Sequence, residues 1–226
     1  AAKGRAEASG GAGARLRDAR RAAVDEALFA AREKIEILQP LRMDLPPTGL
    51  APGRTVLRLD RVTGSYNPDH PVIHDLSLTV AGPERIVIAG PNGSGKTTLL
   101  KIITGQIVPQ SGLVELSVPF ALLDQHVRLL DPALTLRDNF RRLNATADTH
   151  MAHAALARFG FRAADARRFA GELSGGEHLR AGLACALGAT PPPMLLILDE
   201  PTNHLDLDGI AAAEAASAAY DGAALV

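Results

Sequence analysis

One run of eight residues has the types and spacing of a phosphate-binding loop: Gly90-Pro91-Asn92-Gly93-Ser94-Gly95-Lys96-Thr97. The glycines let the backbone fold around phosphate groups, so that successive N–H groups and a helix N-terminus meet the negative charge. Lys96 is expected to reach the β- and γ-phosphates of a nucleotide, and the Thr97 hydroxyl to ligate Mg²⁺. The pattern therefore predicts ATP and Mg²⁺ as cofactors, held by this run together with Thr98.

A second candidate lies about a hundred residues later, where the apolar run Met194–Leu198 ends in Asp199 and Glu200. Asp199 is predicted to hold the Mg²⁺ ion, directly or through water, as the second acidic element of a P-loop nucleotidase does. Glu200 is then placed to polarise a water molecule for attack on the γ-phosphate, as a general base. An apolar strand ending at a polar turn is common by itself, but the P-loop upstream favours the catalytic interpretation.

A third candidate is the segment that opens another helix, Leu173-Ser174-Gly175-Gly176-Glu177. A Ser and two glycines at a helix start can present backbone donors to a phosphate. The same residues also make an ordinary helix cap. Their order, after a P-loop and shortly before the acidic strand, favours the phosphate-binding interpretation.

These candidates need elements that position them. Strands are predicted at 56–60, 76–80, 85–89, 113–116, 120–123 and 194–198; the buried strand 85–89 runs straight into the P-loop, and a helix follows over 96–104. A mostly helical insertion is predicted over about 133–190. Strands alternating with helices indicate a layered α/β domain.

The first part of the chain differs in composition. Residues 1–13 are rich in Gly and Ala and predict a disordered tail or a cloning remnant. A helical pattern follows over about 14–38, ended by Pro40 and the Pro46-Pro47 pair. Residues 14–54 therefore form a predicted linker helix with a Pro/Gly-rich connection, and residues 55–226 the nucleotide-binding domain.

Composition excludes several classes of protein. The net charge is −1, so bulk electrostatics recruit no particular partner. The one cysteine, Cys185, excludes an internal disulfide framework and fits a reducing, cytoplasmic location. No apolar stretch approaches the roughly 18 residues that predict a membrane span, and the first residues lack the apolar core of a signal peptide.

Taken together, the motifs resemble those of the ATP-binding cassette (ABC) family over roughly residues 55–226. Residues 173–177 resemble the family's signature loop, with Glu177 where Gln is more usual. The resemblance implies a mixed sheet core, an antiparallel β subdomain and a helical signature subdomain. It also implies roles for three further residues: adenine stacking for Tyr66, Mg²⁺ and water sensing for Gln125, and contact with a partner domain through the D-loop for Asp206.

The family pattern includes a switch histidine just after the next strand, and the sequence ends at Val226 before that position. His178 and His204 lie in other motifs and do not take that role. The family pairs cassettes head to tail, so that the signature loop serves the site opposite its own P-loop. The chain by itself is therefore expected to bind nucleotide but to hydrolyse it negligibly.

Three features resemble the F subfamily, whose soluble twin-cassette members act on ribosomes. These are the run Glu200–Asp206, the Glu that ends the signature loop, and a leader over 40–50 that resembles the end of an interdomain linker. Residues 1–58 hold eleven Lys and Arg against seven Asp and Glu, which suits contact with rRNA or tRNA phosphate. The implied partners are a second cassette and the ribosome, in translation or in antibiotic resistance.

Other classes stay open to different degrees. The chief alternative is the ATP-binding subunit of a membrane drug exporter, whose partner would be a transmembrane domain. A DNA-repair or chromosome-structure cassette is disfavoured, because the interval between Gln125 and Leu173 is too short for a coiled coil. The signature segment argues against a plain P-loop kinase. The sequence does not decide between a role in resistance and one in translation.

Overall fold

The structure is a computed structural model that describes residues 45–67, 69–200 and 207–226. The chain divides into two units, Ala1–Pro40 and Leu41–Val226, and all of the described residues belong to the second. The predicted tail over 1–13, the predicted helix over 14–38 and Asp206 lie outside the described residues.

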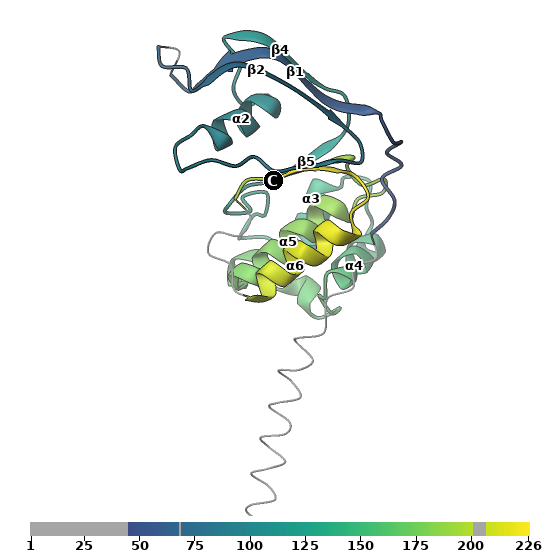
Figure 1. Cartoon of the computed structure of the whole chain (residues 1–226). Helices are drawn as coiled ribbons and strands as arrows, with labels where there is room; N and C mark the ends of the chain where they lie inside the picture. Colours follow the sequence, from purple (N-terminus) through teal and green to yellow (C-terminus); the bar gives the residue numbers. More distant parts are fainter. Residues whose placement is uncertain (1–44, 68, 201–206) are drawn as a thin grey trace, which may run out of the picture. The chain divides into compact units, whose positions relative to one another are not determined.

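A three-stranded antiparallel sheet forms one layer, with strand order β2-β1-β4. Its strands are β1 (Thr55–Gly64), β2 (Ile73–Ala81) and β4 (Ser111–Leu116). The central strand, β1, buries Val56, Leu57 and Leu59 and has an irregular register between Leu59 and Val62. Helix α2 (Lys96–Ile103) lies against the inner side of this sheet (Figure 1).

A second sheet is parallel, with strand order β3-β7-β6-β5. It contains β3 (Arg85–Ile86), β5 (Phe120–Leu123), β6 (Leu195–Leu198) and β7 (Ala223–Leu225). Every residue of β6 is buried, as the all-apolar run predicted. Because the strands are parallel, the residues that follow β3, β5 and β6 meet at one edge of the sheet.

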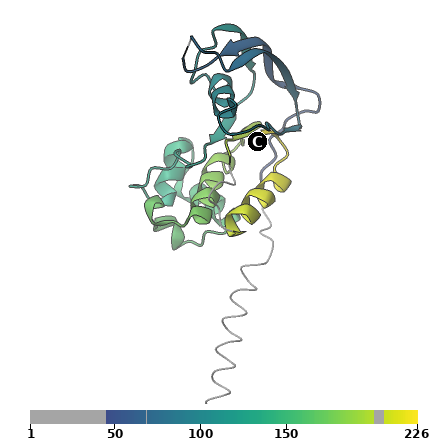
Figure 2. The ribbon, with the colours of Figure 1, turned by 60° about the vertical axis from the view of Figure 1, so that its left-hand side comes forward.

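Helices cover the other face of the parallel sheet (Figures 1 and 2). They are α3 (Leu136–Leu143), α4 (Thr149–Arg158), α5 (Gly175–Leu187) and α6 (Leu207–Ala219), with short 3₁₀ turns η1 (Asp165–Arg167) and η2 (Ala170–Glu172). All of these except α6 lie within the insertion predicted over 133–190. Thr135 and Asp148 cap α3 and α4 through their side-chain oxygens, which explains where these helices begin.

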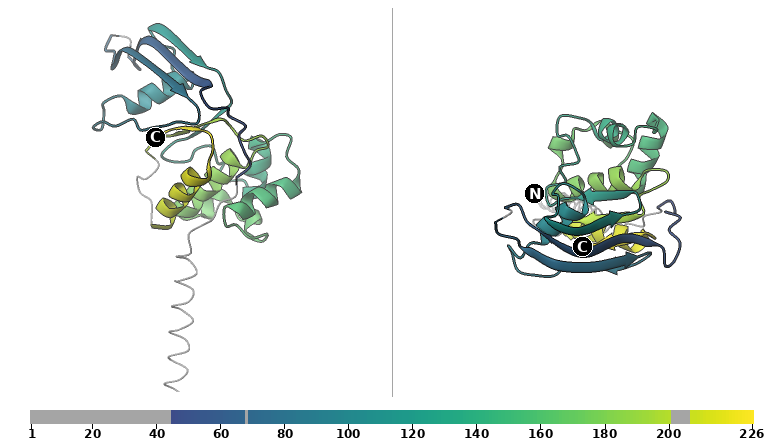
Figure 3. Two further views of the ribbon diagram at one scale, coloured as in Figure 1. Left: turned by 45° about the vertical axis from the view of Figure 1, so that its right-hand side comes forward. Right: turned by 90° about the horizontal axis from the view of Figure 1, so that it is seen from above.

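The parallel sheet separates two apolar cores. Leu196 and Leu198 of β6 pack with the helices, in a cluster that includes Phe140 and Phe159. Leu195 and Ile197 point the other way, into the cluster formed with α2 and the antiparallel sheet. A strand whose side chains alternate between two cores has to be apolar throughout, and this layered α/β arrangement confirms the predicted fold class (Figure 3).

One predicted strand differs from the structure. Residues 85–89 were expected to form a buried strand, but β3 covers only Arg85–Ile86, and Val87 is 73% exposed. The physical reason is that β3 is the edge strand among the described residues and pairs with β7 on one side only. The Ile88 amide still donates to the Val226 carbonyl, so the extended conformation continues toward the P-loop.

The described part of the predicted connection, residues 45–54, belongs to the second unit and packs on the rest of it. Leu50 is buried in the cluster around β1, and the Thr48 amide donates to Asp221 Oδ1 at 2.9 Å. A Cβ at Gly82 would collide with the Leu50 side chain, so this close packing requires glycine there. In the described ranges, no helix is both long enough and apolar enough to cross a bilayer.

Candidate nucleotide-binding site

The P-loop follows β3 and runs directly into α2, as the motif requires. Gly93 and Gly95 have φ angles of 82° and 100°, a region that residues with a side chain rarely adopt. A Cβ at Gly95 would also lie 3.3 Å from Val72 Cγ2 and 3.2 Å from Ile73 Cδ1. The two glycines therefore allow the loop to turn back over the first turn of α2.

Lys96 lies at the centre of this loop. Its Nζ atom donates to the carbonyl oxygens of Gly90 (2.9 Å) and Pro91 (3.3 Å). It also pairs with Glu200 Oε1 at 3.2 Å, with 16% of the lysine side chain exposed. The P-loop lysine and the predicted general base are thus brought together from positions more than a hundred residues apart.

Thr97 and Asp199 are in direct contact, because the Thr97 hydroxyl donates to Asp199 Oδ1 at 3.1 Å. The Asp199 amide donates to the Leu123 carbonyl, which places the end of β6 beside the end of β5. Gln125 follows β5 at the same edge and is half-buried. A hydroxyl and a carboxylate this close supply the oxygen ligands that Mg²⁺ prefers, so these residues fit the predicted ion.

A cavity of about 150 Å³ lies between these groups. It is lined by Val72, Gly93, Gly95, Lys96, Thr97, Thr98 and Glu200. Glu200 has φ 51°, in the left-handed region that non-glycine residues adopt mainly at functional or strained sites. The cavity therefore joins the P-loop to the acidic end of β6.

Tyr66, the predicted adenine-stacking residue, lies just after β1 and is 61% exposed. Lys101 Nζ of α2 lies 4.9 Å from the centre of its ring. A cation over a ring face is attracted by the π electrons, so Lys101 helps to hold the ring in place. This contact was not predicted, because nothing in the sequence links the loop after β1 with the sixth residue of the P-loop helix.

The predicted signature loop opens α5. Ser174 is the N-cap: its Oγ accepts from the Glu177 amide (3.3 Å), and Glu177 Oε2 accepts from the Ser174 amide (2.9 Å). Leu173 packs against the helical core, Gly176 is buried, and Gly175 is exposed beside Ser174. Two exposed residues at a helix N-terminus present polar groups to solvent, as a phosphate-facing loop would.

Glu177 has a second partner that sequence reasoning missed. The Arg168 guanidinium binds both carboxylate oxygens, with Nη1–Oε1 at 2.7 Å and Nη2–Oε2 at 3.0 Å. These bonds lower the pKa of Glu177 to about 2, and the pKa of Arg168 is raised in return. The pair therefore makes its full contribution to the free energy of unfolding above about pH 4.5, and this contribution is lost as the pH falls through about 2. The only signal in the sequence was Glu at a position where Gln is usual.

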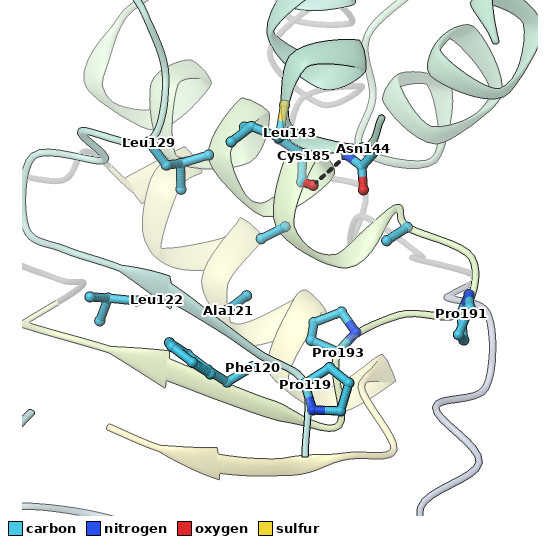
Figure 4. A pocket seen from close by; sticks show the side chains of 12 residues that line it. Pro119, Phe120, Ala121, Leu122, Leu129, Leu143, Asn144, Cys185, Pro191 and Pro193 are labelled. Atoms are coloured by element: carbon cyan, nitrogen blue, oxygen red, sulfur yellow. Dashed lines mark hydrogen bonds between the residues drawn. The ribbon is translucent and has the colours of Figure 1, made fainter. Parts of the chain in front are cut away.

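An apolar pocket of about 330 Å³ lies at the opposite ends of β5 and β6, away from the P-loop (Figure 4). It is lined by Pro119, Phe120, Ala121, Leu122, Leu129, Leu143, Asn144, Cys185, Ala186, Ala189, Pro191 and Pro193. Asn144 Nδ2 donates to the Cys185 carbonyl across it at 3.0 Å. Burial raises the pKa of the Cys185 thiol to about 12, so this thiol stays protonated and unreactive.

A family model, related sequences and solved structures all match this chain, and each is described as, or belongs with, ATP-binding cassette proteins. The family model described as "ABC transporter" matches residues 73–203. The energy-dependent translational throttle protein EttA of Escherichia coli K12 is 36% identical over 186 residues, and that of Mycobacterium tuberculosis H37Rv is 34% identical. Each alignment covers 80% of this chain and 33% of the relative, so the chain spans about a third of the proteins it matches.

An uncharacterized ABC transporter ATP-binding protein of Schizosaccharomyces pombe is 31% identical over 199 residues, which is 86% of this chain and 26% of that protein. Two solved structures resemble the fold at 23% identity and a TM-score of 0.62. One is a metal-chelate type ABC transporter in an inward-facing conformation, with 76% of this chain and 73% of that chain covered. The other is an ABC transporter ATP-binding protein from Pyrococcus furiosus, with 75% and 89% covered.

Proposed function

Because the chain belongs to the ATP-binding cassette family, we propose that it binds MgATP in the cavity between its P-loop and the end of β6. One observation carries this proposal: Lys96, Thr97 and Glu200 line that cavity from two distant segments, and Asp199 accepts a hydrogen bond from Thr97 beside it. The triphosphate would replace the Gly90 and Pro91 carbonyls and Glu200 as the partner of Lys96. The Tyr66 ring, already held by Lys101, is available for the base.

Each residue then has a distinct task in hydrolysis. Thr97 and Asp199 would hold Mg²⁺, which neutralises phosphate charge when bound. Gln125, at the same sheet edge, would orient the attacking water. Glu200 would accept the proton of that water, and its release from Lys96 by the incoming phosphate leaves its carboxylate available as the base.

The proposed setting is a cytoplasmic, F-subfamily protein in which two cassettes close head to tail around ATP. The supporting observations are the similarity to EttA, whose name describes a translational throttle, and the coverage of about a third of its length. Residues 173–177 would complete the site of the other cassette, and Asp206 would contact that cassette. The linker over 14–54 would touch rRNA or tRNA, in translation or in protection against antibiotics.

A second candidate is the ATP-binding subunit of a membrane exporter. The observations in its favour are the family model, which is described as an ABC transporter, and the likeness to transporter structures. Such a subunit would bind a transmembrane protein instead of the ribosome. The two candidates share the same ATP chemistry and differ only in the partner.

Replacing Glu200 with Gln in the complete gene product separates these candidates. The amide keeps the shape and a hydrogen-bond acceptor for Lys96 but cannot take a proton, so ATP should bind while the closed form accumulates. We expect this variant to sediment with ribosomes in ATP at least about tenfold more than the wild type. The double variant with Lys96→Ala, which cannot hold ATP, is the control.

Three outcomes contradict parts of this account. Hydrolysis at the wild-type rate in Glu200→Gln would assign the base to another residue. Retention on membranes instead of ribosomes would favour the exporter. The 226-residue chain alone should release phosphate negligibly at any concentration, and turnover per chain that rises with its concentration and needs Lys96 would show that copies of this chain build a working site by themselves.

A further inference from the structure

The first turn of α5 contains a carboxylate where an amide would be enough for capping. Glu177 accepts from the Ser174 amide through Oε2 at 2.9 Å, while Ser174 Oγ accepts from the Glu177 amide at 3.3 Å. A Gln at this position would supply the same acceptor, because its side-chain oxygen has two lone pairs. The capping contacts alone therefore do not explain a negative charge at Glu177.

The charge is explained by Arg168. Its two terminal nitrogens bind the two oxygens of Glu177 at 2.7 and 3.0 Å, in the parallel geometry that a guanidinium and a carboxylate share. A Gln would offer only one oxygen and would turn an N–H group toward a guanidinium N–H. Arg168 and Glu177 are thus matched to each other, and Oε2 is shared between Arg168 and the Ser174 amide.

Arg168 is itself fixed to a different helix. Its carbonyl accepts from the Leu136 amide at 3.0 Å, and the next residue, Phe169, bridges to Thr135, the N-cap of α3. Its side chain is 34% exposed and that of Glu177 is 24% exposed, so water screens the pair only in part. Arg168 therefore connects the start of α3 with the start of α5.

The contact affects Ser174 directly. Its hydroxyl uses one lone pair for the Glu177 amide, which leaves the hydroxyl hydrogen to be donated outward. Ser174 and Gly175 are both exposed at the helix N-terminus. The Ser174 amide is hydrogen-bonded to the Glu177 carboxylate, and the Ser174 hydroxyl to the Glu177 amide, so the positions of both Ser174 groups depend on how Glu177 is held.

We propose that Arg168 is a positioning residue for the signature loop, holding Glu177 so that Ser174 presents its hydroxyl to the γ-phosphate in the site of the second cassette. This inference rests on the proposed twin-cassette function. It adds that, in this chain, the orientation of the signature loop depends on a guanidinium that is held at the start of α3.

The charged groups around the Arg168–Glu177 pair keep both of its members ionised. Arg180 lies one turn further along α5, with its guanidinium 5.4 Å from the Phe161 ring, and Asp165 lies 3.8 Å from Arg168 Nη1. Glu172 adds a further negative charge near Arg168. With its pKa held at about 2, the Glu177 carboxylate is ionised throughout the physiological range, so the pair is not broken by ordinary changes in pH.

The first test is amide hydrogen exchange of residues 173–178 in the 226-residue chain. Arg168→Met removes the guanidinium but keeps much of the side-chain length, and it should raise exchange at Ser174 and Glu177 about tenfold. Glu177→Gln should raise exchange by a similar factor. The double variant should exchange no faster than the faster of the two single variants, because both changes remove the same contact. Arg137→Met is the matched control, since it removes a comparably exposed ion pair that forms with Asp138, within α3.

The second test is ATP turnover by the complete gene product. Arg168→Met should lower kcat about tenfold without weakening ATP binding to the P-loop of this chain, and Arg168→Lys should restore part of kcat through one contact. If Arg168 only stabilised the fold, its replacement would lower the free energy of unfolding but would not lower kcat while leaving ATP binding unchanged.

The outcomes are distinct. Unchanged exchange at Ser174 and Glu177 in Arg168→Met would overturn the inference, and so would raised exchange with undiminished kcat. A gene product that hydrolyses no ATP would contradict the proposed function instead, and the exchange comparison would still decide whether Arg168 holds the loop.

Discussion

At the scale of single residues, the site is held together by contacts that a nucleotide would have to replace. Lys96 donates to two P-loop carbonyls and pairs with Glu200, and Thr97 donates to Asp199. The same positions that bind one another in this structure are those predicted to bind phosphate and Mg²⁺. The cationic and anionic groups of the site therefore already lie close together, as a ligand made of negative phosphates and a positive Mg²⁺ ion requires.

Asp199→Asn tests the Mg²⁺ assignment. The amide keeps the oxygen that accepts from Thr97 but loses the negative charge, so ATP affinity in Mg²⁺ should fall about tenfold, toward the value measured in a chelator. Titration calorimetry with and without Mg²⁺ measures this. Asp221→Asn is the matched control, because Asp221 likewise accepts a hydrogen bond, from Thr48, at a position outside the nucleotide cavity. An undiminished effect of Mg²⁺ in Asp199→Asn would remove this residue from the ion's ligands.

At the scale of elements, the parts nearest the chemistry were the most predictable. The P-loop, α2 and β6 follow directly from sequence, because glycine spacing and an uninterrupted apolar run each have few structural solutions. The strand predicted over 85–89 was too long and too buried, since an apolar run does not reveal whether its strand lies at an edge. The Arg168–Glu177 pair could not be predicted, because it depends on how the start of α3 meets the segment before α5.

The contact between α5 and the segment after β5 depends on one glycine. A Cβ at Gly182 would collide with Val127 Cγ1 and touch Leu123, so Gly182→Ala should lower the free energy of unfolding by about 1–3 kcal/mol. Chemical denaturation measures the loss. In a Val127→Ala background the collision is gone, and the Gly182 change should then cost little. Equal costs in both backgrounds would show that these two elements do not pack in this way.

At the scale of the whole molecule, the parallel sheet divides the described residues into two cores, and the motifs are distributed between them. Lys96 and Thr97 open α2, whose apolar side chains lie in the core with the antiparallel sheet, whereas the signature loop opens α5, in the helical core. Asp199 and Glu200 follow β6, whose side chains contribute to both cores. A movement of one core against the other on ATP binding would therefore shift Asp199 and Glu200 at the end of β6.

The central claim is that this chain binds ATP through its P-loop, and titration calorimetry of MgATP into the 226-residue chain tests it most directly. We expect one saturable site whose affinity falls at least about tenfold in Lys96→Ala, because the ammonium supplies charge-assisted contacts to phosphate. Arg158→Ala, which removes an exposed cation at the end of α4, should leave the affinity unchanged. Equal affinity in the wild type and in a folded Lys96→Ala variant, with an unchanged melting temperature, would contradict the account.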